Sequence, residues 1–433
     1  MDMIKQLNVN KVPGQRTFLS LSLAILRRLV KMAKANRSQE IHFVTDTYRQ
    51  VSIKNAESAK RAENGSQLMR IHGQALPQQW KKFLSNGENK ELLVEYLDET
   101  WTKVPTSELR GVKVFLAHGR MCHSFSPGKE VTDQVLKVEE PHLCSTQEEA
   151  DTRMYLHAAC AARTYDDVII VGPDTDIFII RIALQSIVPT HMHFHTGRGV
   201  NSRTIDLQSV HDSIGDDVSQ ALIGLHCFTG CDSVSSFYGK GKKKAFNLLL
   251  KERELCNALK DLGEHFDIQL DLLEVFVCKL YGQHSVTTIN EARYNMFRLA
   301  RKSEITMPPN QDALREHIKR ANYQAGIYKR SLQPNAEIPV PDGHGWKMES
   351  GELVINWMNL PPAPDGVMEL AYCTGNCKKS KCGDADTCTC LQNNVPCIDL
   401  CKCARNNCCN ITGHNDLDDD SEDSDSDGEV MGK

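Results

Sequence analysis

Ten of the chain's 17 cysteines fall within the 37 residues between Cys373 and Cys409. A segment this short has almost no hydrophobic core of its own, so bound metal must supply its folding free energy. The other seven cysteines are scattered between Cys122 and Cys278. Scattered single cysteines are typical of a reducing compartment, where a dense cysteine cluster indicates metal rather than disulfides. The sequence therefore predicts a small zinc domain at residues 373–411.

The number of cysteines also predicts how many zinc ions the domain holds. Nine thiolates can complete three tetrahedral sites if three of them each bridge two ions. One of the ten cysteines is then left over, and the adjacent Cys408 and Cys409 are the candidates for it. The predicted ligands are drawn from Cys373, Cys377, Cys382, Cys388, Cys390, Cys397, Cys401, Cys403, Cys408 and Cys409.

The spacing of these cysteines resembles that of a tesmin-type CXC domain. The sequence reads CKKSKC, then CTC and, six residues later, CIDLCKC. It departs from the family in its first pair, which is C-x3-C, and in a longer interval between Cys403 and Cys408. Domains of this type bind DNA, so the resemblance implies phosphate contacts, with Lys378, Lys379 and Lys381 as candidates. The corresponding loop at residues 383–387 is acidic, which leaves the zinc fold better supported than DNA binding.

The net charge of −5 conceals two regions of opposite charge. Residues 416–429 carry nine acids and no base. Removing those nine charges leaves the rest of the chain at +4. We expect residues 412–433 to form a disordered acidic tail, because a run of like charges repels itself and stays solvated. No segment reaches the roughly 18 uncharged apolar residues that a membrane-spanning helix needs, so no membrane partner is expected.

The remaining chain has the pattern of an α/β protein with a helical extension. Strands are predicted at residues 41–46, 112–117 and 168–171, with a helix between them at 145–163. Strands that alternate with helices favour a mostly parallel sheet. The predicted divisions are an N-terminal helix (1–36), the α/β domain (37–262), a helical extension (263–333) and a Pro/Gly-rich linker with one hairpin (334–372).

Acidic residues stand where the α/β pattern would bring them together. Ligands of open α/β sheets bind beyond the carboxyl ends of the strands. Two carboxylates about 4 Å apart repel by about 4 kcal/mol at an effective dielectric constant of about 20. A hard divalent cation such as Mg²⁺ or Mn²⁺ removes that cost, and two such ions can support phosphodiester hydrolysis. The predicted ligands are Asp46, Glu148, Glu149, Asp151, Asp174, Asp176 and Asp232.

Over residues 40–250 the order of these acids resembles the PIN-like nucleases, and more narrowly the flap endonuclease/XPG group. After Asp232 come six residues and then GKGKKKA, which is the spacing of that group. The resemblance implies a PIN-like sheet flanked by helices, two Mg²⁺ or Mn²⁺ ions and a helix-turn-helix-type DNA grip. In that grip Gly239 and Gly241 would form a turn that holds K⁺. Glu149 fits the family's spacing, whereas Glu148 shares a helical face with Asp151, so either is the ligand.

The residues of the grip have a physical rationale of their own. Glycines permit a tight turn whose amide groups point outward as an anion site. Lys242, Lys243 and Lys244 begin the following helix, where cations oppose the helix dipole by about 0.3–1 kcal/mol each. A bound phosphate would reverse that penalty, so these lysines are the predicted contacts to the nucleic-acid backbone.

Two departures from the nuclease pattern keep a second hypothesis open. The family has an aspartate after its second strand, where this chain reads LAHG and places His118. The stretch from there to Glu148 is also too short for the helical arch that threads flap strands. The leading hypothesis is a two-metal nuclease acting on DNA or RNA, with DNA the favoured partner. The alternative is a catalytically inactive nucleic-acid- or chromatin-binding protein with the same scaffold. Both imply a nuclear location, and the acidic tail suggests a protein-interaction scaffold as a third hypothesis.

Two histidine-containing segments have simpler interpretations. His191, His193 and His195 alternate, so on a strand they share one face, which we expect to be half exposed rather than a metal site. His226, Cys227 and Cys231 flank the Gly-Cys-Asp sequence, and packing is favoured there over a zinc site.

Overall fold

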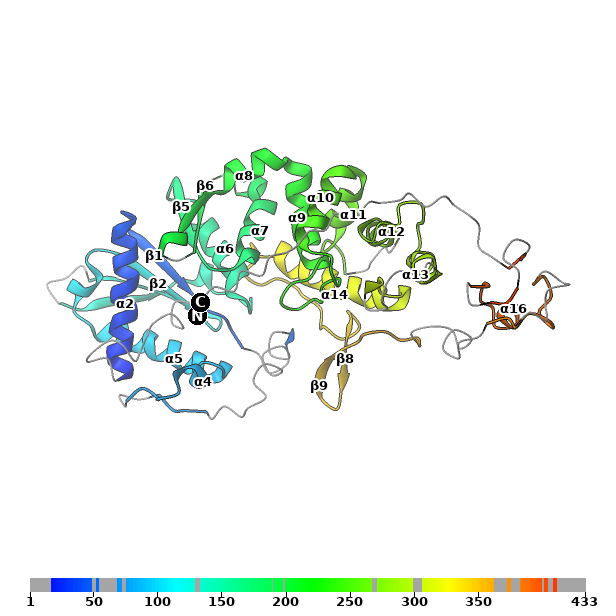
Figure 1. The fold of residues 1–433 in the computed structure, drawn as a ribbon. Helices are drawn as coiled ribbons and strands as arrows, with labels where there is room; N and C mark the ends of the chain where they lie inside the picture. Colours follow the sequence, from blue (N-terminus) through cyan, green and yellow to red (C-terminus); the bar gives the residue numbers. More distant parts are fainter. Residues whose placement is uncertain are drawn as a thin grey trace.

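The chain is described by a computed structural model. It describes residues 17–48, 52–53, 68–71, 75–128, 133–188, 190–197, 199–266, 271–298, 306–361, 372–374, 382–398, 401–403 and 408–410. Figure 1 shows two small sheets and their helices, followed by a helical region, a hairpin and the cysteine segment at the end farthest from α2. Cys377, the three lysines beside it and the acidic tail lie outside the described residues. Within them, no helix is both long and apolar enough to cross a lipid bilayer.

The first sheet lies beneath the long helix α2 (Phe18–Ala35). Thr17 and Ser20 form a capping box at its start, and its apolar face is buried. The sheet has the order β1 (Glu40–Val44), β2 (Lys113–His118), β3 (Met121–Pro127) and β4 (Val135–Glu139). Its other helical elements are α4 (Trp80–Phe83), α5 (Gly87–Thr100), η1 (Trp101–Lys103), η2 (Thr106–Leu109) and η3 (Pro141–Leu143).

The second sheet has three strands in the order β5 (Asp167–Val171), β6 (His191–Thr196) and β7 (Arg203–Asp206). Met192 and Phe194 of β6 are buried in the core. The surrounding elements are α6 (Ala150–Ala161), α7 (Thr175–Ala183), η4 (Gln185–Ile187), η5 (Gly199–Asn201), α8 (Leu207–Ile214) and α9 (Asp216–Phe228).

The sheets are mixed, which corrects the predicted mostly parallel sheet. Only β1 with β2 and β5 with β6 pair in parallel among the described strands. β3 follows β2 after a two-residue turn that contains Gly119, with a φ of 48°, so β3 must run antiparallel. Parallel neighbours need a crossover of a dozen or more residues, which the chain does not supply there. The stretch between His118 and Glu148, which is too short for the helical arch of flap endonucleases, contains β3 and β4.

α6 joins the two halves of the α/β region. It packs against β1 of the first sheet and β5 of the second. Ala150 and Leu156 belong to the hydrophobic cluster against the first sheet, whereas Tyr155 and Ala158 belong to the cluster of the second. The helix begins at Ala150 rather than at residue 145, and residue 149 is its N-cap without a side-chain cap bond, so the expected longer helix was wrong at its start.

The helical region shares its hydrophobic core with the second sheet. One cluster of buried residues extends from Tyr155 to Tyr328. α14 and α11 both pack on α9, and Gly224 of α9 lies directly against the backbone of α11. The helices of this region are α10 (Lys242–Lys251), η6 (Arg253–Leu255), α11 (Cys256–Asp261), α12 (Asp271–Leu280), α13 (Ile289–Arg298) and α14 (Gln311–Lys329).

The last described parts are a hairpin and the cysteine segment. The predicted hairpin is confirmed as β8 (Trp346–Glu349) and β9 (Glu352–Ile355), which pair in antiparallel fashion. Trp346 packs on Tyr323 of α14. The cysteine segment contains one short helix, α16 (Thr389–Gln392), and contacts α13 through a hydrogen bond.

Candidate metal centres

Asp46 lies at the carboxyl end of β1 and faces the start of α6. Its Oδ1 accepts a hydrogen bond of 3.0 Å from the backbone amide of Ala150, the first residue of that helix. Tyr48 donates its hydroxyl to the Oδ2 of Asp46 at 3.3 Å. A helix N-terminus stabilises a carboxylate because its first amides and its dipole are both favourable to negative charge. Asp46 is therefore held in place at the start of α6.

Asp174 and Asp176 follow β5 and begin α7. Asp174 is the N-cap, and its Oδ1 accepts from the amide of Asp176 at 3.4 Å. Asp176 is buried, and its oxygens are 2.5 Å from the Tyr328 hydroxyl and 2.9 Å from His226 Nε2. Burial and the neighbouring Asp176 raise the pKa of Asp174. Burial alone would also raise the pKa of Asp176, but His226 and Tyr328 lower it below its ordinary value.

Asp151 occupies the most unfavourable electrostatic position of the group. It lies in the first turn of α6. Burial raises the pKa of Asp151 to about 8, with further contributions from the negative charges of Glu149, Asp174, Asp46 and Asp176. At neutral pH this carboxyl therefore keeps its proton unless a cation replaces it.

Glu149 and Glu148 are placed differently, which bears on the alternative left open by the sequence. The Glu149 Oε1 accepts from the Gln324 amide at 3.3 Å, and its charge acts on Asp151. Glu148 is positioned by its backbone, because its carbonyl accepts from the Thr47 amide at 2.8 Å. The geometry favours Glu149 over Glu148 as the acid that faces Asp151.

Asp232 reaches the same neighbourhood from the loop after α9. Cys231 and Val234 exchange backbone hydrogen bonds of 3.0 and 3.3 Å, which closes a tight turn around Asp232. The negative charge of Asp232 contributes to the raised pKa of Asp174. Ser233 donates to the Oε1 of Gln324 at 2.7 Å, so the same glutamine contacts both this loop and Glu149.

Four separate segments thus bring six of the seven predicted carboxylates within electrostatic reach of one another: Asp46, Glu149, Asp151, Asp174, Asp176 and Asp232. In the described chain, no three of these carboxylates have ligand atoms that all lie within 4.8 Å of one another. A bound ion would therefore have to draw the side chains inward. The donors fit Mg²⁺ or Mn²⁺, because they are hard oxygen ligands whose mutual repulsion a divalent cation relieves.

Four residues that contact these carboxylates were missed by sequence reasoning: Tyr48, His226, Gln324 and Tyr328. His226 adjoins the Gly-Cys-Asp sequence, but the sequence favoured packing alone for it. Gln324 and Tyr328 lie on α14 in the segment predicted as a helical extension. The hydroxyl of Tyr328 reaches an acid 152 positions earlier in the chain, and no local sequence pattern signals such a contact.

The loop that contains Gly239 and Gly241 joins α9 to α10. Gly239 has a φ of 66°, and Gly241 is the N-cap of α10. Lys242 turns back toward α9, donating to the His226 carbonyl at 2.9 Å and also to the Gly230 carbonyl. Its ammonium therefore satisfies carbonyls at the end of α9. All three lysines, Lys242, Lys243 and Lys244, are exposed. Phosphate contacts by these lysines and K⁺ binding at the turn stay predictions.

His118 belongs to a second polar group at the end of β2. Asp98 Oδ1 is 3.0 Å from His123 Nδ1, and Asp98 Oδ2 is 3.7 Å from His118 Nε2. Lys137 forms an ion pair with the same carboxylate. Burial alone raises the pKa of Asp98, but His118 and Lys137 lower it below its ordinary value. His118 is therefore positioned against an acid of α5.

The alternating histidines of β6 lie on its more exposed face, as predicted. His191 is exposed and His193 and His195 are half exposed. The ligand atoms of His191, His193 and Asp167 of β5 lie within 4.8 Å of one another. This group is open to solvent, and clusters of this kind are common without an ion.

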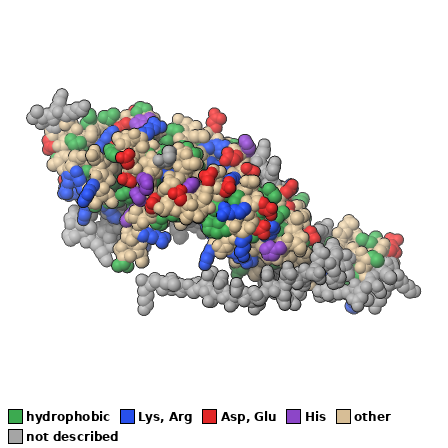
Figure 2. Space-filling model, turned by 90° about the horizontal axis from the view of Figure 1, so that it is seen from above, with side chains coloured by type: hydrophobic (Ala, Val, Ile, Leu, Met, Phe, Trp, Pro, Cys, Tyr) green, Lys and Arg blue, Asp and Glu red, His purple; other side chains and the backbone are tan. Residues whose placement is uncertain are grey.

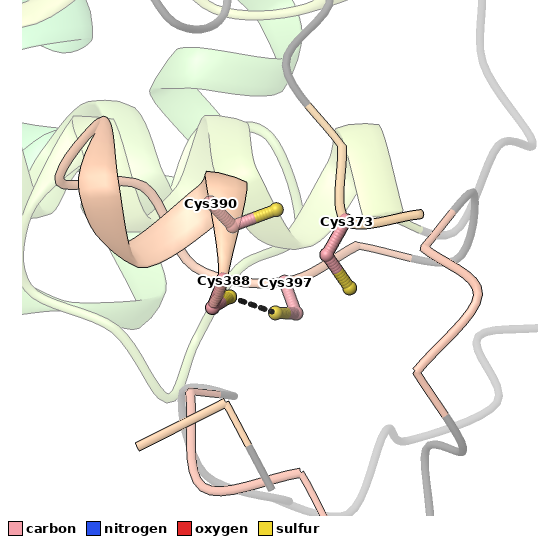
Figure 3. A group of neighbouring side chains, drawn as sticks. All are labelled: Cys373, Cys388, Cys390 and Cys397. Carbon is pink, nitrogen blue, oxygen red and sulfur yellow. Dashed lines mark hydrogen bonds between the residues drawn. The ribbon is translucent and has the colours of Figure 1, made fainter. Parts of the chain in front are cut away.

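The described cysteines form three overlapping groups that could hold a metal such as zinc. In each group the four sulfur atoms lie within 4.8 Å of one another. Figure 3 shows one of them, with the Cys388 and Cys397 sulfurs 3.8 Å apart. Burial and neighbouring thiols raise the pKa of both Cys390 and Cys403 to about 12. The groups are Cys373, Cys388, Cys390 and Cys397; Cys373, Cys397, Cys401 and Cys403; and Cys382, Cys397, Cys403 and Cys408.

The surface charge is mixed around these centres. In Figure 2 acidic side chains (red) and basic side chains (blue) are interspersed over the described part of the face in view, rather than gathered into one basic surface. Attraction of a polyanion to this face would therefore depend on a few local cations.

Comparisons with protein families, with curated proteins and with solved structures found no match for this chain.

Proposed function

We propose that the α/β region is a PIN-like nuclease that hydrolyses phosphodiester bonds with two Mg²⁺ or Mn²⁺ ions. One observation carries the proposal: the charges of carboxylates from three separate segments act on Asp151 and help to raise its pKa to about 8. Keeping so many acids together costs stability, since each close pair repels by a few kcal/mol. Such a cost is expected where charge is needed for cation binding.

In this proposal the protein's side chains would hold the cations and orient the carboxylates that bind them. Asp46, Glu149, Asp151, Asp174, Asp176 and Asp232 would hold the cations, which supply Lewis-acid activation of water and of the phosphodiester when bound. Tyr328 fixes the Asp176 carboxylate by a hydrogen bond, with His226 Nε2 in close contact, and Gln324 fixes Glu149 against the loop of Asp232. The exposed Lys243 and Lys244 would attract the phosphate backbone.

The test is cleavage of single-stranded and branched DNA and RNA by the full-length chain, with and without Mn²⁺. The double variant Asp174→Asn/Asp176→Asn should lose the metal-dependent activity. Asp212→Asn is the matched control, because Asp212 is exposed on α8 and away from the carboxylates. Wild-type cleavage no faster than that of the double variant would refute the enzymatic proposal.

A second candidate function is nucleic-acid binding without catalysis. It is favoured by His118, which replaces the family's second-strand aspartate and contacts Asp98. It is also favoured by Lys242, whose ammonium is already bound by backbone carbonyls. This candidate predicts DNA binding that weakens steeply with salt and no metal-dependent cleavage. A nuclear location and chromatin partners belong to the same proposal.

We propose further that the cysteine segment is a CXC-type domain with three zinc ions. Cys373 and Cys403 each belong to two of the sulfur groups and Cys397 belongs to all three, so these are the bridging thiolates. Five other described cysteines would be terminal ligands, and Cys377 supplies the ninth thiolate that three tetrahedral sites require. Cys409, which is exposed, is then the spare cysteine.

Zinc content measured by elemental analysis and native mass spectrometry tests this assignment. Wild type should carry about three zinc ions per chain. Cys409→Ser should keep all of them, whereas Cys397→Ser should lose at least one because a bridging thiolate is shared by two sites. Equal zinc content in the two variants would contradict the assignment.

A further inference from the structure

A hollow beside the carboxylates combines a polar loop with an aromatic ring. It has a volume of about 550 Å³ and is lined by residues 230–236, by Arg320 of α14 and by Ile355 and Trp357 at the end of the hairpin. Asp232 is among the lining residues, and its charge acts on Asp174. The hollow therefore adjoins the proposed catalytic centre, and its volume suits a ligand the size of a nucleotide.

Trp357 differs from every other tryptophan of the chain. Its side chain is 58% exposed, whereas Trp80, Trp101 and Trp346 are at most 7% exposed. A large aromatic ring left in water beside a polar hollow gains free energy when a flat ligand covers it. The burial of the other three also makes Trp357 the chain's single accessible indole.

The Arg320 guanidinium packs against one face of the Trp357 ring. The guanidinium carbon is 5.4 Å from the centre of the indole ring, and the same group donates to the Asn356 carbonyl at 2.6 Å. Burial lowers the pKa of Arg320 to about 10, which leaves it charged at neutral pH. A cation on one face of the ring disfavours a second cation on the other and leaves stacking with a neutral aromatic ligand as the favourable contact.

We infer that Trp357 is a stacking platform for an unpaired nucleobase of a single-stranded polynucleotide. The loop hydroxyls of Ser235 and Ser236 line the same hollow and can hydrogen-bond base edges or sugar. A base stacked on Trp357 places its own backbone beside Asp232. The inference rests on the proposed function for its choice of polymer, and it assigns to the hairpin a role outside the segment that resembles a nuclease.

The experiment follows indole fluorescence while a single-stranded oligonucleotide is added to the full-length chain in Ca²⁺, alongside a parallel binding assay. Quenching of the exposed Trp357 is expected with the normal oligonucleotide and not with an abasic one of equal length. Trp357→Ala should weaken binding about 5- to 150-fold, and Trp357→Phe should restore most of the affinity. Met358→Ala is the matched control, since Met358 is the exposed neighbour that does not line the hollow.

The outcomes separate this inference from the proposed nuclease activity. Equal quenching by the abasic strand, unchanged affinity in Trp357→Ala, or no binding at low salt would each overturn the platform. Metal-dependent cleavage together with any of these results would support the nuclease proposal and refute the stacking role of Trp357. Base-dependent quenching without cleavage would support the platform and refute the nuclease.

Discussion

Asp151 shows what a single residue contributes to this site. Its carboxyl is half-buried among like charges, so the folded protein binds its proton far more tightly than the unfolded chain does. With a folded pKa of about 8 and an ordinary value of 3.8, the folded state keeps a proton between those pH values that the unfolded state has released. Stability is therefore lost as pH rises through this range, at up to about 1.4 kcal/mol per pH unit.

Replacing Asp151 with asparagine should remove that pH dependence. Without Mg²⁺ or Mn²⁺, Asp151→Asn should be more stable than wild type at pH 8, and the difference should shrink toward pH 5. Urea denaturation at pH 5, 6, 7 and 8 measures both slopes. Parallel stability curves for the two proteins would show that Asp151 does not carry the raised pKa.

Tyr328 and Tyr155 offer a matched comparison of two buried hydroxyls. Tyr328 donates to the Asp176 carboxylate at 2.5 Å, and Tyr155 donates to the neutral carbonyl of Leu184 at 3.0 Å. Tyr328→Phe should cost about 1.5–3 kcal/mol of unfolding free energy at pH 7, and Tyr155→Phe about 0.5–1.5 kcal/mol. Chemical denaturation of both variants checks the order. A larger loss in Tyr155→Phe would mean that Asp176 is not ionised beside Tyr328.

The acids themselves could be predicted from the sequence, because strand ends and a fixed spacing mark them. Asp46, Asp174 and Asp176 each follow a strand closely, and Asp232 precedes the glycine turn by a set interval. The groups that orient them could not be predicted, since Gln324 and Tyr328 approach through tertiary packing of α14. The choice between Glu148 and Glu149 also depended on where α6 begins, and helix starts are set by contacts as well as by local pattern.

Among the secondary-structure elements, α9 places two parts of the carboxylate site, His226 and the loop that carries Asp232. It carries His226 near its end and leads into the loop of Asp232, and its other side packs on α11. Gly224 permits that approach, because a Cβ there would be 1.9 Å from the backbone oxygen of Leu259. The Leu259 backbone cannot rotate away from an added Cβ as a side chain could, so α9 and α11 would have to move apart.

Gly224→Ala should therefore lower the unfolding free energy by about 1–3 kcal/mol. Gly241→Ala is the control, since its φ is −69° and no atom lies within 4 Å of the position that an added Cβ would occupy. That variant should stay within about 0.5–1 kcal/mol of wild type, because the reduced freedom of the unfolded chain and the poorer N-cap oppose each other. Thermal denaturation compares them, and equal melting temperatures would mean that α11 yields to the added methyl group.

The alternation of strands and helices correctly predicted an α/β chain but not its strand directions. β2 and β3 are separated by two residues, and no strand was predicted at β3 or β4. Register and direction are decided by turn geometry, which Gly119 sets here with a positive φ. The hairpin of β8 and β9 was predictable because prolines and glycines bound it on both sides.

At the scale of the whole molecule, the cysteine segment is structurally distinct from the rest. Its hydrophobic cluster consists almost entirely of cysteine side chains and includes no residue of the α/β or helical cores among those described. A hydrogen bond from the Tyr294 hydroxyl to the Cys397 carbonyl, 3.0 Å long, joins it to α13. Its stability should therefore depend on metal and not on the neighbouring core.

Removal of zinc should unfold this segment alone. After chelation, amide hydrogen exchange should accelerate sharply over residues 382–398 and stay unchanged in β2, β3 and α9. Cys397→Ser should reproduce the effect without chelator. Loss of protection in β2 or α9 after chelation would show that the metal supports the larger core as well.

The two sheets of the α/β region have separate hydrophobic clusters, and this separation has a mechanical consequence. Asp46 extends from the cluster of the first sheet, whereas Asp174, Asp176 and Asp232 extend from the cluster of the second. Divalent ions shared by these side chains would cross-link two bodies that otherwise meet mainly through α6. Calorimetry should then resolve two overlapping melting transitions in the ion-free protein and a single cooperative one when Mn²⁺ saturates the site.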